Sequence, residues 1–312
     1  MTANPASTQM TTIGSVLEVS RRFVTILGSD NCIITGTGSS KTLEVVAGDV
    51  VSFERREGEI FVTAVEPSSR NLFRSTHGKL KKMGANIDGL FVITASGATF
   101  NPVVIDRMLV AAQVQAIPAT LVVNKIDLGT EHLDEMVAVY RRIGVPVIFS
   151  SAKRGDGIDQ IVSIVRAPSA QVLALCGVSG VGKSSILNKL IPGTRTKTGA
   201  VSEKTGQGKQ TTTQPRGFLY EDPDASRPKI IIDLPGVQFF GLSHISLEQV
   251  GAAFQEIREV ATRCRFGDCK HLKEPECAVK EAVDRGEIAS WRYESYLQIV
   301  DEIRDARPSW RP

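Results

Sequence analysis

A glycine-rich run that ends in lysine and serine is the strongest chemical signal in the chain. It has the form G-x-x-x-x-G-K-S and consists of Gly177, Val178, Ser179, Gly180, Val181, Gly182, Lys183 and Ser184, with Ser185 next to it. An apolar strand precedes it and a helix follows, a context that disfavours the alternative of a glycine-rich turn without nucleotide. Its backbone N–H groups can wrap phosphates. We expect Lys183 to neutralise the β- and γ-phosphates and Ser184 to ligate Mg²⁺.

A second motif selects the base. The run Asn124, Lys125, Ile126 and Asp127 follows an apolar strand. A carboxylate at Asp127 accepts hydrogen bonds from guanine N1–H and the 2-amino group, whereas adenine would leave the acid unpaired. Asn124 and Lys125 are expected to buttress the loop. A companion loop after the next strand would bring a backbone N–H to guanine O6, through Ala152 within Ser150, Ser151, Ala152 and Lys153.

Two further segments predict a magnesium and γ-phosphate site. Asp233 and Gly236 form a D-x-x-G motif at the end of an apolar strand. We expect Asp233 to reach Mg²⁺ through water and the Gly236 N–H to reach the γ-phosphate. The threonine-rich stretch 206–213 is predicted to be a first switch that completes the Mg²⁺ shell. We assign that role to Thr212, with Thr211 or Thr213 as alternatives.

Cysteines and a histidine gather near the C-terminus as Cys264, Cys269, His271 and Cys277. The spacing C-x4-C-x-H-x5-C supplies three thiolates and one imidazole, a closed tetrahedral shell for Zn²⁺. A closed shell indicates a structural metal and not a catalytic one. Scattered buried cysteines are the alternative, and disulfides suit a reducing compartment less well than metal does.

The pattern of apolar residues predicts the elements that position these motifs. Residues 13–66 read as five short strands, which suit an OB-fold, with an SH3-like barrel as the alternative. Residues 89–233 alternate strands with helices, the pattern of an α/β domain with a mostly parallel sheet. Each nucleotide motif follows a strand, where open α/β sheets bind ligands. Three helices are expected after the last strand, at 247–262, 278–285 and 291–304.

The chain has 312 residues, so we expect about two or three domains. The predicted fold class is multidomain: an N-terminal β-barrel of the OB-fold type, a central α/β P-loop domain, and a small helical zinc-binding domain that depends on its metal to fold. The predicted boundaries are a disordered tail at 1–12, the OB-fold at 13–66, the P-loop domain at 67–245 and the zinc domain at 246–312.

We expect a soluble, cytoplasmic and monomeric protein that does not associate with membranes. Apolar residues make up 42% and charged residues 23%, and no stretch approaches the roughly 18 apolar residues that a membrane helix needs. The first twelve residues lack the basic start and apolar block of a signal peptide.

The net charge of +3 is unevenly distributed. Residues 67–85 carry five basic side chains and no acid, and residues 193–216 carry five basic side chains against one acid. These segments can pair with RNA phosphates, with a solvated surface as the alternative. Aromatic residues are only 6%, which favours recognition of the backbone and shape of folded RNA over base stacking.

The guanine-nucleotide motifs occur in circularly permuted order. GTPases usually place the P-loop first, then the switch threonine and D-x-x-G, and the two base-reading motifs last; here the base-reading motifs precede the P-loop. The D-x-x-G segment therefore runs almost directly into the metal module. We hypothesise that nucleotide state sets the pose of that module, which hydrogen exchange in residues 247–277 with GDP and a GTP analogue would test.

In this order and with these flanking modules, the chain resembles the RsgA/YjeQ family of ribosome small-subunit-dependent GTPases across nearly its whole length. The matching segments are Ile105 to Arg107, the motifs at Asn124 and Gly177, the threonines at Thr211, Asp233 to Gly236, Phe240 to Leu242, and Cys264 to Val279. The resemblance implies GTP hydrolysis stimulated by the small subunit, and an OB-fold and zinc domain that dock on 16S rRNA during late 30S assembly.

Two positions matter for the attacking water. Gln210 stands where the family usually has histidine, and Val237 stands where Ras-like enzymes keep a water-positioning glutamine. Glutamine can orient a water but cannot take its proton near neutral pH. Gln210 is our candidate for that role, and a polar switch residue without a catalytic role is the alternative.

These observations predict a GTP-hydrolysing assembly factor of the 30S subunit that binds 16S rRNA, with catalytic residues Lys183, Gln210, Thr212, Asp233 and Gly236. An alternative is an rRNA-binding module in which nucleotide acts as a conformational clamp and turnover is incidental. A metallochaperone GTPase would need exchangeable metal, which the closed cysteine and histidine shell disfavours.

Overall fold

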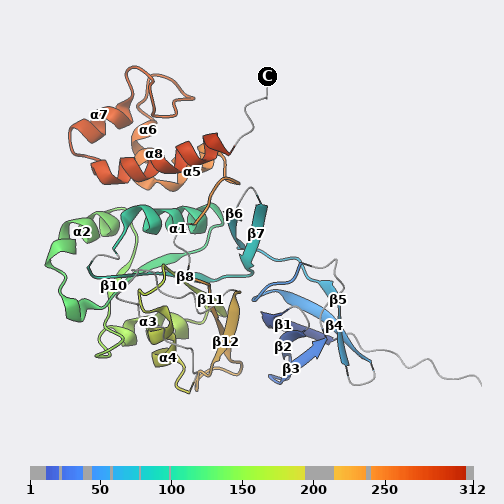
Figure 1. The fold of residues 1–312 in the computed structure, drawn as a ribbon. Coiled ribbons are helices and arrows are strands. Elements are labelled where there is room, and N and C mark those ends of the chain that lie inside the picture. The colour runs from blue at the N-terminus through green and yellow to red at the C-terminus, as the bar shows by residue number, and fades with distance from the viewer. Residues whose placement is uncertain are drawn as a thin grey trace, which may run out of the picture.

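The computed structural model describes residues 12–20, 23–37, 44–56, 59–76, 79–97, 100–193, 214–236 and 240–306. Figure 1 shows N-terminal strands, a central sheet with helices on both faces, and a C-terminal group of helices. None of the helices within these ranges combines the length and apolar composition that a membrane crossing needs. Apart from Thr12, the tail expected at 1–12 lies outside the described residues.

The N-terminal part contains the five strands that the sequence predicts. They are β1 (Thr12–Val19), β2 (Phe23–Gly28), β3 (Ile33–Thr37), β4 (Val50–Arg56) and β5 (Glu59–Val65). Their antiparallel order is β3-β2-β1-β4-β5. The sheet curls so that β3 meets β5, and the two strands lie so close that a side chain at Gly36 would collide with Ile60. This closure agrees with the predicted OB-type barrel and buries Phe53 and its apolar neighbours.

The central sheet carries five parallel strands in the order β10-β9-β8-β11-β13. Their bounds are β8 (Gly89–Ala95), β9 (Ala119–Asn124), β10 (Val147–Phe149), β11 (Val172–Cys176) and β13 (Lys229–Asp233). The antiparallel β12 (Arg216–Tyr220) pairs with β13 on one side and touches β1 on the other through Glu18 and Arg216. The N-terminal strands and the central sheet therefore form one continuous hydrogen-bonded surface.

Helices cover both faces of this sheet, as Figure 1 shows. They are α1 (Pro102–Val114), α2 (Asp134–Arg142), α3 (Ile158–Arg166) and α4 (Lys183–Leu190), with the 3₁₀ turns η1 (Ile126–Leu128) and η2 (Glu131–Leu133). Strand β8 has apolar residues on both faces: Leu90 and Val92 pack into the core of α1, while Phe91 and Ile93 pack into the core of α3 and α4. The motif loops are consequently fixed at the carboxyl edge of a sheet that is buried on both sides.

The C-terminal part differs from prediction at its first helix. The helix expected at 247–262 is two helices, α5 (Leu247–Ala253) and α6 (Gln255–Ala261), because Phe254 adopts an extended conformation with ψ of 98°. Phe254 is fully buried and packs edge-on against Tyr296 at 5.6 Å, and this packing outweighs the local preference for helix. The other helices, α7 (Ala278–Asp284) and α8 (Ser290–Asp305), lie where they were predicted.

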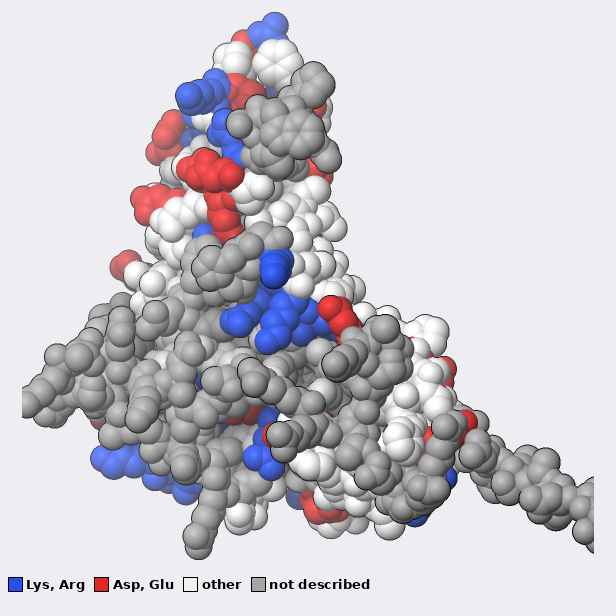
Figure 2. Space-filling model, turned by 45° about the vertical axis from the view of Figure 1, so that its right-hand side comes forward, with Lys and Arg blue, Asp and Glu red and all other residues white. Residues whose placement is uncertain are grey.

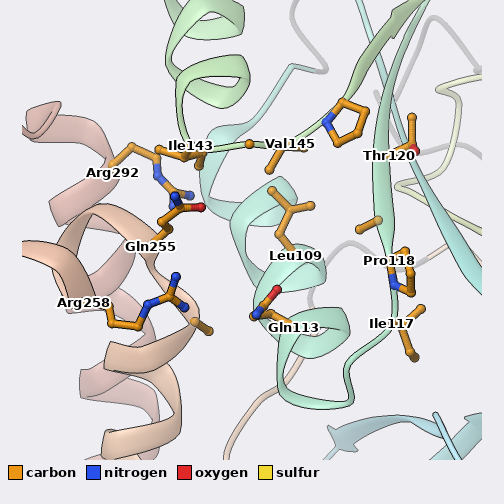
Figure 3. A pocket seen from close by; sticks show the side chains of 14 residues that line it. Leu109, Gln113, Ile117, Pro118, Thr120, Ile143, Val145, Gln255, Arg258 and Arg292 are labelled. Carbon is orange, nitrogen blue, oxygen red and sulfur yellow. The ribbon is translucent and has the colours of Figure 1, made fainter.

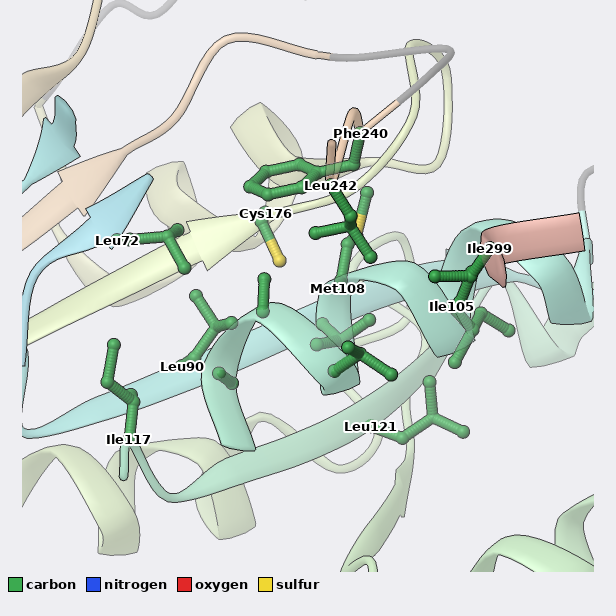
Figure 4. Close-up of a cluster of buried hydrophobic side chains, with 14 of the residues drawn as sticks. Leu72, Leu90, Ile105, Met108, Ile117, Leu121, Cys176, Phe240, Leu242 and Ile299 are labelled. Atoms are coloured by element: carbon green, nitrogen blue, oxygen red, sulfur yellow. The ribbon is translucent and has the colours of Figure 1, made fainter. Parts of the chain in front are cut away.

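A hairpin within the basic segment 67–85 was not predicted. It consists of β6 (Leu72–Thr76) and β7 (Lys79–Gly84). Leu72 and Met83 enter the main hydrophobic core, while Lys79 and Lys81 are exposed. Figure 4 shows that Leu72 shares this core with residues of the sheet, of α1 and of α8. The C-terminal module is thus packed against the central domain through a common core.

Candidate nucleotide and metal sites

The glycine-rich loop joins β11 to α4 at the carboxyl edge of the sheet. Gly177 and Gly182 have φ of 153° and 98°, values that favour glycine. A side chain at Gly177 would collide with the Ile93 carbonyl, and one at Gly182 would collide with the Asn124 amide. The loop therefore packs directly against β8 and against the predicted guanine motif.

Lys183 lies buried beneath this loop. It is 9% exposed, and its Nζ donates a hydrogen bond to the Gly177 carbonyl at 3.0 Å. Burial lowers the pKa of Lys183, and the nearby Asp233 opposes that shift. A Cβ placed on Gly236 would be 3.2 Å from Nζ. The P-loop and the D-x-x-G segment therefore meet at this lysine.

Asp233 ends β13 with an unsatisfied carboxylate oxygen. Its Oδ1 is buried and has no hydrogen-bond partner among the described residues. Burial raises the pKa of Asp233 to about 6, and Lys183 limits the rise. An orphaned carboxylate oxygen beside a P-loop fits Mg²⁺, which prefers oxygen ligands. The chemistry of this donor matches the predicted magnesium role, and Ser184 directly follows the lysine that Asp233 approaches.

Asn124 joins three loops by hydrogen bonds. Its Nδ2 donates to the Val181 carbonyl of the P-loop at 2.8 Å, and its Oδ1 accepts from the Ala152 N–H at 3.1 Å. The Ser150 hydroxyl lies 3.3 Å from the same Oδ1. Asn124 is only 1% exposed, so this amide holds the phosphate and base loops at a fixed separation.

Asp127 is held in the form that a guanine base requires. The Ser151 hydroxyl donates to its Oδ1 at 2.6 Å, and this bond chiefly lowers the pKa of Asp127. An ionised carboxylate only accepts hydrogen bonds, which matches the two donors on the edge of guanine. Lys125, with φ of 61°, turns the chain so that Asp127 enters η1.

These loops enclose a pocket of about 560 Å³. Its lining includes three residues that the sequence reasoning missed, Leu128, Asn188 and Lys189. Asn188 and Lys189 stand three and four residues after Ser185 on α4, a spacing that places them on one helix face and could have revealed them. Leu128 is 68% exposed beside Asp127, where an apolar side chain can cover a base.

The cysteine and histidine residues converge as predicted. One ligand atom from each of Cys264, Cys269, His271 and Cys277 lies within 4.8 Å of all the others. The His271 Nδ1 is 3.6 Å from the Cys264 Sγ and 3.5 Å from the Cys277 Sγ. Tetrahedral Zn²⁺ with bonds of about 2.3 Å to sulfur and about 2.0 Å to nitrogen requires separations of about 3.5 Å. The cluster is consistent with a zinc site.

A second cavity, of about 380 Å³, lies between α1 and the α5–α6 pair, as Figure 3 shows. It adjoins the amino ends of β9 and β10, whereas the nucleotide motifs lie at the carboxyl ends. Its two arginines already have partners: Arg258 donates to the Ala252 carbonyl, and Arg292 pairs with Glu256. Nothing in its lining suggests phosphate or metal chemistry.

Comparison with known proteins decides the family. A family model described as RsgA GTPase matches residues 65–243, more than half of the chain and all of the nucleotide motifs. The chain belongs to the RsgA GTPase family. The resemblance predicted from the permuted motifs is therefore confirmed.

Curated relatives and solved structures agree with this RsgA assignment. The chain is 37% identical over 277 residues to the small ribosomal subunit biogenesis GTPase RsgA of Actinobacillus pleuropneumoniae serotype 5b (strain L20), covering 86% of this chain and 78% of the relative. It is 39% identical over 265 residues to the protein of the same name from Ectopseudomonas mendocina (strain ymp), covering 83% and 75%. The structure is similar to that of YjeQ from Thermotoga maritima, with a TM-score of 0.71 and 26% identity over 96% of this chain and 100% of that one. It is also similar to YloQ, described as a circularly permuted GTPase, with a TM-score of 0.67 and 25% identity over 99% and 100%.

Some predicted residues of this RsgA-family site cannot be located. Gln210 and Thr212, with the alternatives Thr211 and Thr213, lie outside the described residues, as does Val237. The remaining predicted nucleotide residues are all described, and they line the loops at the carboxyl edge of the sheet.

We predict that magnesium binding at this site depends on pH through the protonation of Asp233. The folded-state pKa is raised above 3.8 to about 6, so the ionised form costs stability above about pH 6 in the metal-free protein, and Mg²⁺ offsets that cost. We expect the Mg²⁺ affinity of the GDP complex to fall between about pH 7.5 and about pH 5.5. Calorimetric titration measures it, and Asp233→Asn should leave only the smaller dependence that protonation of the GDP β-phosphate, with a pKa of about 6, produces by itself. Equal pH dependence in the wild type and in Asp233→Asn would contradict the assignment.

Proposed function

We propose that the chain is a GTPase that acts in the biogenesis of the small ribosomal subunit. The observation that carries the proposal is the convergence of the P-loop, the two base-reading loops and the D-x-x-G segment, with Asn124 and Lys183 joining them. Membership of the RsgA family supports GTP as the nucleotide. The names of the curated relatives support the small ribosomal subunit as the partner.

The proposed chemistry is phosphoryl transfer from GTP to water. Lys183 stabilises charge on the β- and γ-phosphates, and the Gly236 N–H donates to the γ-phosphate. Ser184, Thr212 and Asp233 hold Mg²⁺, which when bound neutralises charge on the phosphates. Gln210 orients the attacking water. The guanine base lies between the Lys125 and Lys153 loops, with its edge at Asp127.

The hairpin β6–β7 is the proposed contact for 16S rRNA. Figure 2 shows Lys and Arg side chains gathered between the C-terminal module and the N-terminal strands, where Figure 1 places this hairpin. Lys79 and Lys81 are exposed, whereas Lys82 pairs with the buried Asp49 at 2.6 Å. Neither of these two exposed lysines has an ion-pair partner within the part of the chain that the structure describes, so they can approach RNA phosphates directly.

The remaining assignments follow from the same proposal. We divide the chain into an OB-fold at 13–66, a permuted GTPase domain at 67–245 and a zinc domain at 246–312. Zinc is structural, and the protein acts as a cytoplasmic monomer until it binds the 30S subunit.

The test is GTP turnover with purified ribosomal subunits. We expect small subunits to stimulate turnover and large subunits to have no effect. Lys183→Ala should lower turnover at least about a hundredfold with or without subunits, because it removes a charge that stabilises the transition state. Equal turnover with both subunits would overturn the proposal. A Lys183 variant that binds GTP, cannot hydrolyse it and still supports assembly would favour the clamp alternative.

A further inference from the structure

The hairpin β6–β7 places two like charges opposite one another. In its antiparallel pairing, Arg74 of β6 lies directly across from Lys81 of β7. Directly opposed side chains lie on the same face of a hairpin, and like charges in this position destabilise the pair. No carboxylate within the described ranges pairs with either cation. The free protein therefore has an electrostatic cost at this position, and a bound anion would offset it.

Arg74 also has an unmet hydrogen-bond donor. Its Nε is buried and has no partner among the residues that the structure describes. Buried donors in folded proteins nearly always have an acceptor, so one without an acceptor indicates strain or a missing ligand. The guanidinium group carries its N–H donors in a planar fork that fits the oxygens of a phosphate. Arg74 is therefore suited to bind an oxyanion.

The opposite face of the hairpin is occupied by contacts within the protein. Side chains alternate along a strand, which places Phe73 and Ser75 on the face that Arg74 does not use. The Phe73 ring packs edge-on against His244 at 6.4 Å. The Ser75 N–H donates to the Gly241 carbonyl at 2.9 Å, and the Ser75 Oγ lies 2.8 Å from the His244 Nδ1. These contacts fix the hairpin, so the charged pair has a defined position on the other face.

A crevice of about 220 Å³ adjoins Lys81, between the hairpin, the barrel and the start of β12. Its lining includes residues 45–47 of the loop before β4, Lys81 and Lys82 of β7, and Gln214 and Pro215 before β12. Most of the lining residues are apolar, and both cations come from β7. Aliphatic walls beside a positive charge suit a nucleoside and the phosphate attached to it.

Hydrogen bonds hold the walls of this crevice in place. The Lys82 Nζ donates to the Asp49 Oδ1 at 2.6 Å, and the Asp49 Oδ2 accepts from the Val46 N–H at 2.9 Å. Asp49 is fully buried, so this pair joins β7 firmly to the loop before β4. Lys82 is neutralised by the contact, whereas Lys81 is exposed and available to a ligand. The crevice is therefore formed before anything binds, which lowers the cost of binding.

We propose that Arg74 and Lys81 bind one phosphate group of an RNA strand, and that the crevice beside them takes the unpaired nucleotide attached to that phosphate. A phosphate between the two cations removes their repulsion and gives Arg74 an acceptor. The apolar walls favour a nucleotide over inorganic phosphate. The nucleotide is unpaired, because bases in an RNA helix are stacked and cannot enter a crevice. The inference rests on the proposed function for RNA as the partner of this hairpin, and it adds the site and the single-stranded character of the ligand.

The first test measures binding of a short single-stranded oligouridylate to the full-length chain, with saturating GDP present so that the P-loop is filled. We expect Arg74→Gln and Lys81→Gln each to lower the affinity about fivefold at low salt, because each removes a charged contact to phosphate. Arg142→Gln is the matched control. Arg142 is exposed at the end of α2, which packs on β10 at the end of the central sheet away from the hairpin (Figure 1). Its replacement should change the affinity less than about twofold.

The dependence of the affinity on salt counts the phosphates that bind. For single strands, the slope of log K against log salt concentration falls in magnitude by about 0.7 for each phosphate contact removed. The double variant Arg74→Gln/Lys81→Gln should show a decrease of about 0.7, because both cations share one phosphate. A decrease of about 1.4 would show two separate phosphate contacts and would overturn the shared site.

The crevice itself distinguishes RNA from free phosphate. The methyl resonances of Val46, which lines the crevice, should shift when oligouridylate is added. Inorganic phosphate alone should leave them unchanged, since it has no nucleoside to enter the crevice. Unchanged Val46 resonances at saturating oligouridylate would exclude a nucleotide at this place.

The stability of the free protein provides an independent measurement. Lys81→Gln removes the repulsion on Arg74, so it should raise the melting temperature by about 1–2 °C while it weakens RNA binding. Lys79→Gln is the control for this effect, because Lys79 is exposed on the same strand but lies opposite an uncharged residue, Thr76. It should leave the melting temperature unchanged.

The inference is overturned if Lys81→Gln binds oligouridylate as tightly as the wild type does, or if Arg142→Gln weakens binding as much. These outcomes do not involve ribosomes. A protein that binds oligouridylate as expected, but whose GTP turnover does not respond to small subunits, would contradict the proposed function and leave this site intact.

Discussion

Replacing Asp127 with asparagine should change the base that the pocket accepts, from guanine to xanthine. The Ser151 hydroxyl donates to the Asp127 Oδ1 at 2.6 Å, and the side-chain oxygen of an asparagine would keep that bond. Its NH₂ group would then face the 2-amino group of guanine, donor against donor. Xanthine carries a carbonyl oxygen there instead. The variant loses one hydrogen bond to a charged group, gains a donor–donor contact, and keeps the other bond only to a neutral oxygen. Together these changes correspond to a GTP affinity about a hundredfold lower, with a gain for xanthosine triphosphate.

Equilibrium titration with GTP, ATP and xanthosine triphosphate measures this change. Asp156→Asn is a matched control, because Asp156 lies in the companion loop but pairs with Arg154 on the surface at 2.7 Å. It should leave all three affinities within about twofold, as surface ion pairs contribute little. If Asp127→Asn binds GTP as well as the wild type does, the base is not read at this carboxylate.

Cys277→Ala should release the metal and unfold the C-terminal module. Cys277 is 3% exposed and precedes α7 as its N-cap residue. Structural zinc contributes on the order of 10 kcal/mol to the folding of zinc-finger peptides. This contribution is as large as the whole free energy of unfolding of a typical small domain. Metal analysis after dialysis against a chelator should find one zinc in the wild type and none in the variant. Hydrogen exchange in residues 262–285 should rise sharply.

Cys32→Ala is the control for this experiment. Cys32 is an exposed cysteine directly before β3 and lies outside the cluster. Its replacement should leave one zinc per chain and the same hydrogen exchange. A Cys277 variant that retains a full equivalent of zinc after the same dialysis would show that the metal is held elsewhere.

The sequence predicted the nucleotide loops well because local signals define them. A run of glycines that ends in lysine and serine marks the P-loop, and each base-reading motif comes directly after an apolar strand. The sheet brings the carboxyl ends of its parallel strands together, so motifs 53 residues apart in sequence, such as those at Asn124 and Gly177, become neighbours. Their proximity follows from the α/β pattern alone.

Other features were not accessible to local reasoning. The break at Phe254 has no glycine or proline to mark it and results from burial against Tyr296. The hairpin β6–β7 was concealed because its lysines read as a run of charge. The pairing of Arg107 with Glu302 joins residues 195 positions apart, and nothing in the spacing of single charges identifies such a partner.

Helix α8 contacts the metal cluster near its start and contacts the chain that follows the D-x-x-G motif near its end. The Tyr293 hydroxyl donates to the His271 carbonyl at 2.6 Å, and the Tyr296 hydroxyl donates to the Lys270 carbonyl at 2.8 Å. Nine residues after Tyr293, about 13 Å along the axis, Glu302 holds Leu242. If α8 couples the nucleotide state to the pose of the C-terminal module, thermodynamic linkage makes that coupling reciprocal. If GTP favours one pose of the module, then an RNA surface that selects the same pose must tighten GTP binding by an equal factor, and release of either ligand weakens the hold on the other.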